Sequence, residues 1–286
     1  MNAHTPLYVR SYFIVYLYPM PKIAWISALC VVAVLATGFT PPHHGKTGRF
    51  LKRHGFMYIP GQADGMNHDF YIQAYEISNE NYRYFLNDLQ IKGRYDELRI
   101  AGVDTAQWDA IFGDSSAYSK FYFQHEAYDH YPVVNISYEG AVMYCKWLTE
   151  AYSLRGFNIE VRLPDSTEWK IAARGGEADN TYGWGKDSYI SKQGYYRCNA
   201  KKGDTCSLTL TPVMAYTTNR YGLYNMSGNT TEMLLEKGKH KGGGWNSPEP
   251  NIRIDGPDDY AGISGPSPFI GFRPIAIIHD EKTTAK

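Results

Sequence analysis

The chain has 286 residues, of which 29 are basic and 29 acidic, so its formal net charge is zero. This neutrality excludes the strongly basic character with which many proteins bind nucleic acids or anionic membranes. Hydrophobic residues make up 43% of the chain and aromatic residues 15%, which is enough for a sizeable core and excludes general disorder. The 27 glycines and 15 prolines predict many turns.

Residues 1–38 are typical of an export signal. Residues 23–39 (IAWISALCVVAVLATGF) carry no charge, Lys22 precedes them, and Met20 is an alternative start. The run is short for a membrane-spanning helix, although an uncleaved anchor that holds the protein at a membrane is the alternative. We therefore expect an exported protein of the periplasm or of the outer-membrane-associated cell envelope. Residues 39–54 are interpreted as a linker, 55–278 as a domain and 279–286 as a tail.

The domain begins with two expected strands, within residues 55–62 and 68–78. Ser78 then caps a helix, where Ile77 and Tyr82 have the spacing of a hydrophobic staple. Residues 91–131 follow without clear periodicity and are rich in aromatic side chains. Because a protein does not leave this many aromatic rings exposed to water, we expect the segment to be ordered. It would form either internal packing or an interface with a partner.

A second helix is expected after Ser137, and a third where Asp165 and Glu168 form a capping-box pattern. Gly175 ends the third helix, and no further helix is expected beyond it. Helices that come early and irregular β-structure that comes late predict an α+β domain with little regular secondary structure.

The cysteines favour a local disulfide. Cys198 and Cys206 flank a short polar loop, and in an exported chain we expect them to be bonded; two free thiols are the alternative. Cys145 lies in a helical pattern and is expected to be a buried apolar residue. The spacing of the cysteines does not match a structural zinc site.

Seven segments after Pro132 carry a resemblance. In order they are YPVVNISYEGAVMYCKWL, VRLPDSTEWKIAARGG, YGWG, CNA, TPVMAYTTNRYGLYNMSGNTTEM, KGGGWNS and GFRP. Together they resemble the formylglycine-generating enzymes, also called sulfatase-modifying factors, over about residues 55–276. The resemblance implies a single α+β domain with a C-type lectin-like fold.

The departures from the family pattern concern its catalytic residues. In the enzymes, two cysteines near the glycine-rich motif bind copper and oxidise a substrate cysteine. Those positions fall on Ser247 and Ile252, neither of which supplies a thiolate, so we expect no copper. Trp245, Asn246 and Ser247 would then line a binding groove without catalytic atoms.

The resemblance also implies a structural calcium ion. Asn225, Gly228, Thr230 and Glu232 match the family's calcium ligands position by position, and oxygen ligands of this kind suit Ca²⁺. The alternative is a plain turn. A second calcium site of the family would begin at Asn199, where the expected disulfide could hold the loop in its place.

The resemblance gives the functional expectation as well. Residues 104–137 are similar to a stretch in the members associated with gliding motility and type IX secretion. We expect an exported, non-catalytic protein that binds other envelope proteins and no nucleic acid. The alternatives are an active oxidase that modifies a substrate cysteine, and a lectin-like module that binds glycans or peptides.

Overall fold

The computed structural model describes residues 45–61, 66, 68–203 and 209–279. The chain divides into two units, residues 1–42 and a compact unit over 43–286. The expected export signal lies outside the described residues, as does the expected tail apart from its first residue, His279. None of the helices in the described ranges is long and apolar enough to cross a membrane.

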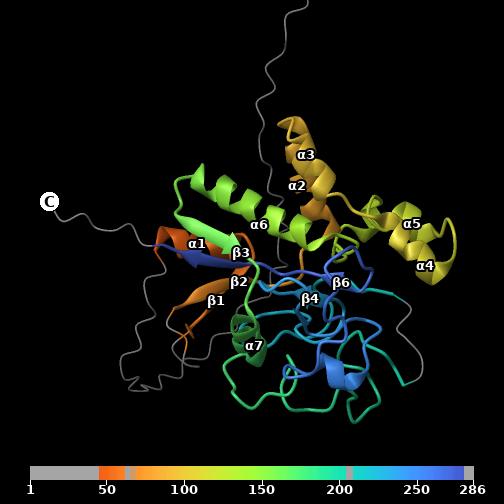
Figure 1. The fold of residues 1–286 in the computed structure, drawn as a ribbon. Helices are drawn as coiled ribbons and strands as arrows, with labels where there is room; N and C mark the ends of the chain where they lie inside the picture. The colour runs from red at the N-terminus through yellow and green to blue at the C-terminus, as the bar shows by residue number, and fades with distance from the viewer. Residues whose placement is uncertain (1–44, 62–65, 67, 204–208, 280–286) are drawn as a thin grey trace, which may run out of the picture. The chain divides into compact units, whose positions relative to one another are not determined.

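A run of helices lies between the early strands and the late ones, and the last third of the chain is mostly turns and loops (Figure 1). This confirms the expected α+β class. The elements are α1 (Lys46–Arg53), β1 (Phe56–Ile59), β2 (Phe70–Gln73), α2 (Asn79–Ile91), α3 (Tyr95–Ile100), η2 (Thr105–Trp108), α4 (Asp109–Phe112), α5 (Ala117–Phe121), η3 (Glu126–Tyr128), α6 (Tyr138–Ser153), β3 (Ile159–Arg162), α7 (Ser166–Arg174), β4 (Thr231–Met233), β5 (His240–Lys241), η4 (Glu249–Ile252), β6 (Ile270–Gly271) and β7 (Ile275–Ile278).

The three predicted helices begin where their caps were predicted. Ser78 and Ser137 each accept a hydrogen bond from a first-turn backbone N–H, and Asp165 forms a complete capping box with Glu168. Gly175 ends α7 with φ 63°, in the left-handed region that favours glycine. Polar caps therefore fixed these boundaries, because each satisfies backbone donors that the helix itself leaves unpaired.

The main sheet has the order β1-β2-β7-β3, and every neighbouring pair is antiparallel. The last strand of the chain thus lies between β2 and β3. Side chains alternate between the two faces of the sheet: Tyr71 and Ala276 belong to one apolar cluster, whereas Ile72 and Ile275 belong to another. Both faces are therefore covered, which requires the apolar residues seen on both sides of these strands.

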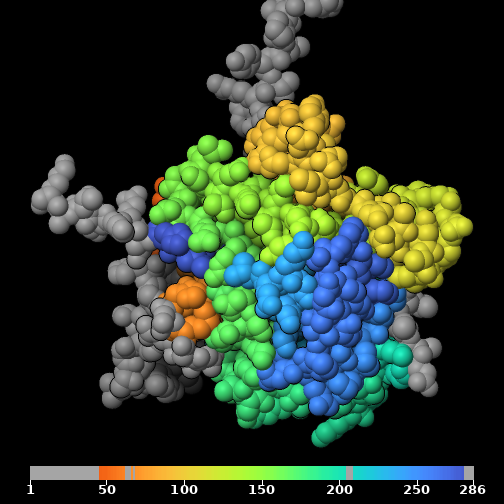
Figure 2. Space-filling view, in the orientation of Figure 1, coloured from red at the N-terminus to blue at the C-terminus, as the bar shows by residue number. Residues whose placement is uncertain are grey.

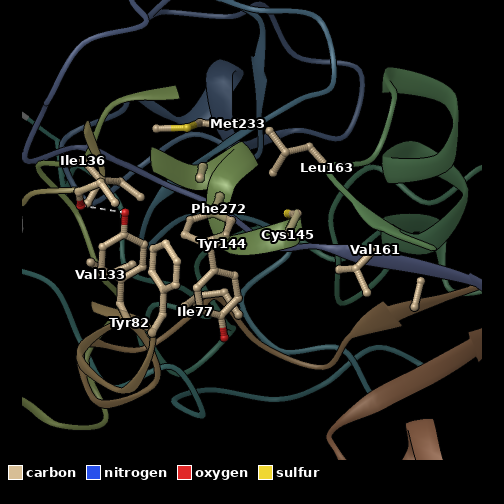
Figure 3. Packing of buried hydrophobic residues seen from close by; sticks show 14 of the residues in the cluster. Ile77, Tyr82, Val133, Ile136, Tyr144, Cys145, Val161, Leu163, Met233 and Phe272 are labelled. Atoms are coloured by element: carbon tan, nitrogen blue, oxygen red, sulfur yellow. Dashed lines mark hydrogen bonds between the residues drawn. The ribbon is translucent and has the colours of Figure 1, made fainter. Parts of the chain in front are cut away.

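The first cluster packs α2 and α6 on one face of the sheet. Figure 3 shows Tyr82 of α2 and Tyr144 of α6 with Phe272 beside them. The rings of Tyr82 and Tyr144 stack at 5.8 Å, and the Tyr82 hydroxyl donates to the carbonyl oxygen of Ala101 at 2.9 Å. Cys145 is buried in this cluster, as predicted, and burial raises the pKa of its thiol. The second cluster packs Trp169 of α7 on the opposite face.

A second, smaller sheet has the order β5-β4-β6. It lies among the loops of the last third of the chain, which pack beside the segments around α6 and α7 (Figure 2). Strand β4 pairs with β5 antiparallel and with β6 in parallel. This sheet carries Glu232 and leads directly into the glycine-rich loop after Lys241.

The linker assignment was wrong for residues 46–53, which form α1 as part of the domain. Leu51 is fully buried, and Phe50 stacks on Phe157 with ring centroids 4.0 Å apart. The basic, glycine-containing composition of this stretch suggested a linker. Two apolar side chains in register with the core are enough to fold it against the domain.

The aromatic segment is largely internal packing. Trp108, Tyr122 and Phe123 are buried, and the Trp108 ring lies 4.9 Å from that of Tyr122. Phe112 and Phe121 remain exposed, at 39% and 50%. The segment is less irregular than expected, because it contains the short helices η2, α4, α5 and η3. Most of its rings are therefore explained by the domain's own core.

Candidate functional site

The glycine-rich loop after β5 packs its backbone against neighbouring segments. Gly242 and Gly243 have φ values of 93° and 63°. A Cβ atom on Gly243 would lie 2.9 Å from Cγ2 of Ile252 and 3.0 Å from a backbone oxygen of Asn251. Glycine is therefore required here both for the backbone conformation and for the close approach of η4.

The two positions where the resemblance places copper-binding cysteines are both inaccessible. Ser247 is fully buried; its hydroxyl accepts from the Gly244 N–H at 2.8 Å and donates to Oδ2 of Asp259 at 2.6 Å. Ile252 is fully buried in a cluster with Tyr182 and Cys198. The residues present thus do not fit a copper centre, because one is engaged in loop hydrogen bonds and the other has no ligand atom.

Asp259 was not singled out from the sequence, although it holds this loop together through Ser247. Burial raises the pKa of Asp259, while the hydrogen bond from Ser247 acts in the opposite direction. Nearby, His240 donates its backbone N–H to Asp258 at 2.8 Å, and its ring nitrogen Nδ1 lies 3.4 Å from the same carboxylate. No group of three or more His, Cys, Asp or Glu side chains within the described ranges is arranged to hold a metal ion.

The predicted groove of Trp245, Asn246 and Ser247 is not a groove. Trp245 is only 3% exposed; its indole N–H donates to the carbonyl oxygen of Pro268 at 3.1 Å and its ring packs on Phe269. Asn246 accepts a hydrogen bond from the Tyr260 hydroxyl. Trp245 and Ser247 thus face the core, and Asn246 is half-buried.

An open depression lies beside the loop instead. Its lining residues are Thr181, Tyr182, Lys186, Ser188, Tyr189, Glu249 and Arg253. Glu249 accepts from the Tyr182 hydroxyl and pairs with Arg253 at 2.7 Å, and these partners hold the pKa of Glu249 below its usual range. Tyr182 also stacks on Trp184, with centroids 4.7 Å apart. The YGWG motif thus supplies a wall of this depression, and the charges that line it are largely paired.

The residues proposed for calcium take part in a buried hydrogen-bond network. Oxygens of Glu232 accept from Nε and Nη2 of Arg273 at 2.7–3.1 Å, and Oε2 accepts from the indole N–H of Trp169 at 2.7 Å. Glu232 and Arg273 are 1% and 0% exposed. A carboxylate with these partners has few lone pairs left, and the guanidinium would repel a cation. The geometry does not fit a calcium centre that depends on the Glu232 carboxylate.

The other predicted ligands adjoin a second buried carboxylate, Glu76. The Asn225 and Asn229 amides donate to its two oxygens at 3.1 Å and 2.8 Å. Burial raises the pKa of Glu76 to about 7, although Arg273 opposes that shift. Gly228 has φ 83°, and its N–H donates to the Gly242 carbonyl oxygen at 2.8 Å. Thr230 is fully buried, and its hydroxyl has no hydrogen-bond partner among the described residues.

Sequence reasoning found the positions of this network but not its partners. Glu76 lies in an unremarkable strand-like stretch, and Arg273 belongs to the quoted GFRP segment without an assigned role. The signal available was the apolar sequence around Arg273, which predicts that its side chain is buried. A buried arginine needs hydrogen-bond acceptors, so a buried carboxylate partner could have been expected.

The disulfide prediction lies partly outside the described residues, which exclude Cys206. Cys198 is 3% exposed, and burial raises the pKa of its thiol to about 12. Asn199 has a side-chain oxygen that is buried without a partner among the described residues. The bond between Cys198 and Cys206 stays a prediction.

Comparisons with known proteins agree with the fold and with the order of the motifs. The family model of the sulfatase-modifying factor enzyme 1-like domain matches residues 46–276. The chain is 36% identical over 115 residues to the formylglycine-generating enzyme of Thermomonospora curvata, which covers 37% of this chain and 34% of that protein. It is 26% identical over 197 residues to the mouse formylglycine-generating enzyme, covering 57% and 48%. It is 36% identical over 105 residues to the mouse inactive C-alpha-formylglycine-generating enzyme 2, covering 35% and 30%.

The chain therefore spans between about a third and about a half of the length of these relatives. Among solved structures, the crystal structure of CarF matches with a TM-score of 0.55 and 18% identity, over 78% of this chain and 98% of that one. The structure of PvdO from Pseudomonas aeruginosa matches with a TM-score of 0.50 and 18% identity, over 78% and 90%. At this identity these likenesses concern the fold alone. Because the family model covers most of the chain, the protein belongs to the sulfatase-modifying factor family and has a single formylglycine-generating-enzyme-like domain.

Proposed function

We propose that this protein is a non-catalytic formylglycine-generating-enzyme-like domain that acts by binding another protein. The observation that carries the proposal is the state of the two positions where the enzymes have cysteines. Ser247 is buried and holds the loop through Gly244 and Asp259, and Ile252 is buried in an apolar cluster. A side chain used in this way supplies neither a soft metal ligand nor a nucleophile.

The chain is about equally similar to relatives described as enzymes and to relatives described as inactive. The mouse and bovine inactive C-alpha-formylglycine-generating enzymes 2 match this chain at 36% and 35% identity, which is in the same range as the bacterial enzymes at 36% and 33%. Overall identity thus does not separate active from inactive relatives. The proposal therefore depends on the side chains of Ser247 and Ile252 and not on overall identity.

The activity test compares the wild-type protein with a matched variant. Purified protein is incubated with Cu(I) and a cysteine-containing sulfatase peptide, and aldehyde formation is measured by mass spectrometry beside an active relative. We expect no aldehyde from the wild type and no tight Cu(I) binding. The double variant Ser247→Cys with Ile252→Cys places a thiol at both positions and should bind Cu(I). Aldehyde from the wild type clearly above a copper-free blank would refute the proposal.

We further propose that the binding partner is a component of a cell-envelope assembly, of the kind that serves gliding motility or type IX secretion. The sequence similarity of residues 104–137 to those members supports this, together with the apolar N-terminal segment. Within residues 104–137, the exposed rings of Phe112 and Phe121 offer a contact surface, because aromatic side chains anchor many protein interfaces.

Cross-linking in the native membranes, followed by mass spectrometry, tests this role. Phe112→Ser with Phe121→Ser should remove the specific cross-links, whereas Tyr195→Ser, a 75% exposed ring elsewhere, should retain them. Equal cross-linking by both variants would place the contact on another surface.

A further inference from the structure

The neutral net charge of the chain conceals a segregation of charge along its length. Residues 1–63 contain six Lys and Arg residues and no Asp or Glu, whereas the remaining 223 residues contain 23 basic and 29 acidic residues. Four of the six basic residues lie in α1. Charge that is concentrated in one helix acts locally, whatever the total charge of the chain, because the potential falls off within a Debye length of about 10 Å.

The structure places the basic side chains of α1 on its outer face. Lys46, Arg49 and Arg53 are exposed and lie on one side of the helix, whereas Gly48 and Leu51 on the other side are buried against the domain. Lys52, also exposed, extends the same face. The helix is therefore fixed by its apolar side and presents a basic stripe to the solvent.

The turn that follows α6 continues this surface. Phe50 of α1 stacks on Phe157, and the Lys46 ammonium lies 5.6 Å from the centroid of the same ring. The turn carries the exposed Arg155 and also Leu154, which at 84% exposure is the most exposed large apolar residue of the described chain.

We infer that α1 and the turn at residues 154–155 form a docking surface for an anionic phospholipid membrane. Basic side chains next to an exposed leucine are the combination that binds such a surface, through attraction to the lipid phosphates and insertion of the apolar side chain. The position of α1 agrees, because its first residue, Lys46, follows the uncharged run of residues 23–39 by only seven positions. This inference is independent of whether the domain has oxidase activity.

The test uses residues 43–286, which form a compact unit that contains the apolar clusters described above. This fragment excludes the apolar N-terminal run, which would bind any bilayer. Cosedimentation is measured with vesicles of phosphatidylcholine alone and of phosphatidylcholine with phosphatidylglycerol. We expect binding only to the anionic vesicles, and loss of binding as the salt concentration rises.

Two charge-matched variants locate the surface. Lys46→Gln, Arg49→Gln and Arg53→Gln together should lower partitioning about a hundredfold, since each basic residue near an anionic surface contributes roughly a factor of five. The control changes three exposed lysines elsewhere, Lys120, Lys192 and Lys239, to Gln and should partition like the wild type. Leu154→Ser should weaken binding while leaving its salt dependence unchanged.

Each contrary result is distinct. Equal losses in the two triple variants would mean that only the net charge matters and would overturn the inference, as would equal binding to neutral and anionic vesicles. Tighter binding to a DNA duplex than to the anionic vesicles would assign the stripe to a different partner and would also overturn it. Circular dichroism melting checks that the variants are folded, which we expect because the altered side chains are exposed.

Discussion

The buried pair of Glu232 and Arg273 gives the sharpest test of how the domain is held together. Each side chain is at most 1% exposed, and Arg273 donates to the carboxylate through both Nε and Nη2. Removing one partner leaves the other charge buried without its main partner, which costs about 3–5 kcal/mol. Since a domain of this kind is stable by roughly 5–15 kcal/mol, Glu232→Gln or Arg273→Met alone should remove a large part of its stability.

The assay is urea unfolding followed by tryptophan fluorescence, in a double-mutant cycle. If the two side chains act as a pair, the double variant Glu232→Gln with Arg273→Met should lose less stability than the two single variants added together. The difference in the free energy of unfolding should be at least about 2 kcal/mol. Arg273→Lys keeps the charge but loses the planar two-point geometry, and should fall between the wild type and Arg273→Met.

Repeating the cycle in calcium and in chelator separates this account from calcium binding. An ion-pair role for Glu232 predicts the same unfolding curves in both solutions. A calcium ion held by Glu232 would instead add roughly 2.7 kcal/mol at a hundred times its dissociation constant, and Glu232→Gln would abolish that increment. That second result, with additive single variants, would refute the reasoning from the hydrogen-bond network.

Three further outcomes are expected. Phe123→Ser, at a site 4% exposed, should cost about 3–5 kcal/mol in thermal melting, whereas Phe121→Ser, at 50% exposure, should melt like the wild type; equal losses would contradict the described packing. Burial raises the pKa of Glu76 from 4.5 to about 7, so the folded state holds this proton more tightly than the unfolded state. The free energy of unfolding should therefore fall by up to about 3 kcal/mol as the pH rises from 4.5 to 7. In urea unfolding, Glu76→Gln should show a smaller fall in stability over this pH range than the wild type. Parallel pH profiles for the two proteins would contradict the assignment to Glu76. Thiol counting on denatured residues 43–286 should find one free thiol if Cys198 and Cys206 are bonded, and three if they are not.

The helices were predictable because their signals are local. Ser78, Ser137 and Asp165 each satisfy backbone donors within their own first turn, so the sequence around the cap is sufficient. The α+β class followed from the order of such signals along the chain. Helix α1 was missed because Leu51 is its only large buried side chain, and the ring on which Phe50 stacks is more than 100 residues away at Phe157.

The site was predictable by position and not by role. Motif spacing located the loop around Ser247 and the turn around Asn225, but the partners of these residues come from distant segments. Asp259 fixes Ser247, and Arg273 takes the carboxylate of Glu232. Whether a polar side chain binds an ion, lines a groove or holds a loop depends on those partners, and spacing along the chain does not contain them.

The place of β7 in the main sheet has a consequence for how the protein is made. Strands β1, β2 and β3 lie on either side of a strand that follows all three of them in the chain, at Ile275–Ile278. While the chain emerges from the ribosome, β2 and β3 have no common neighbour, and the two apolar faces of the sheet cannot close. The domain should therefore remain open until β7 has been made, and a stop codon before Ile275 should leave a chain that is degraded or aggregates. A domain that cannot close before β7 has been made is well suited to transfer in an extended form, because no stable fold competes with the transfer until then.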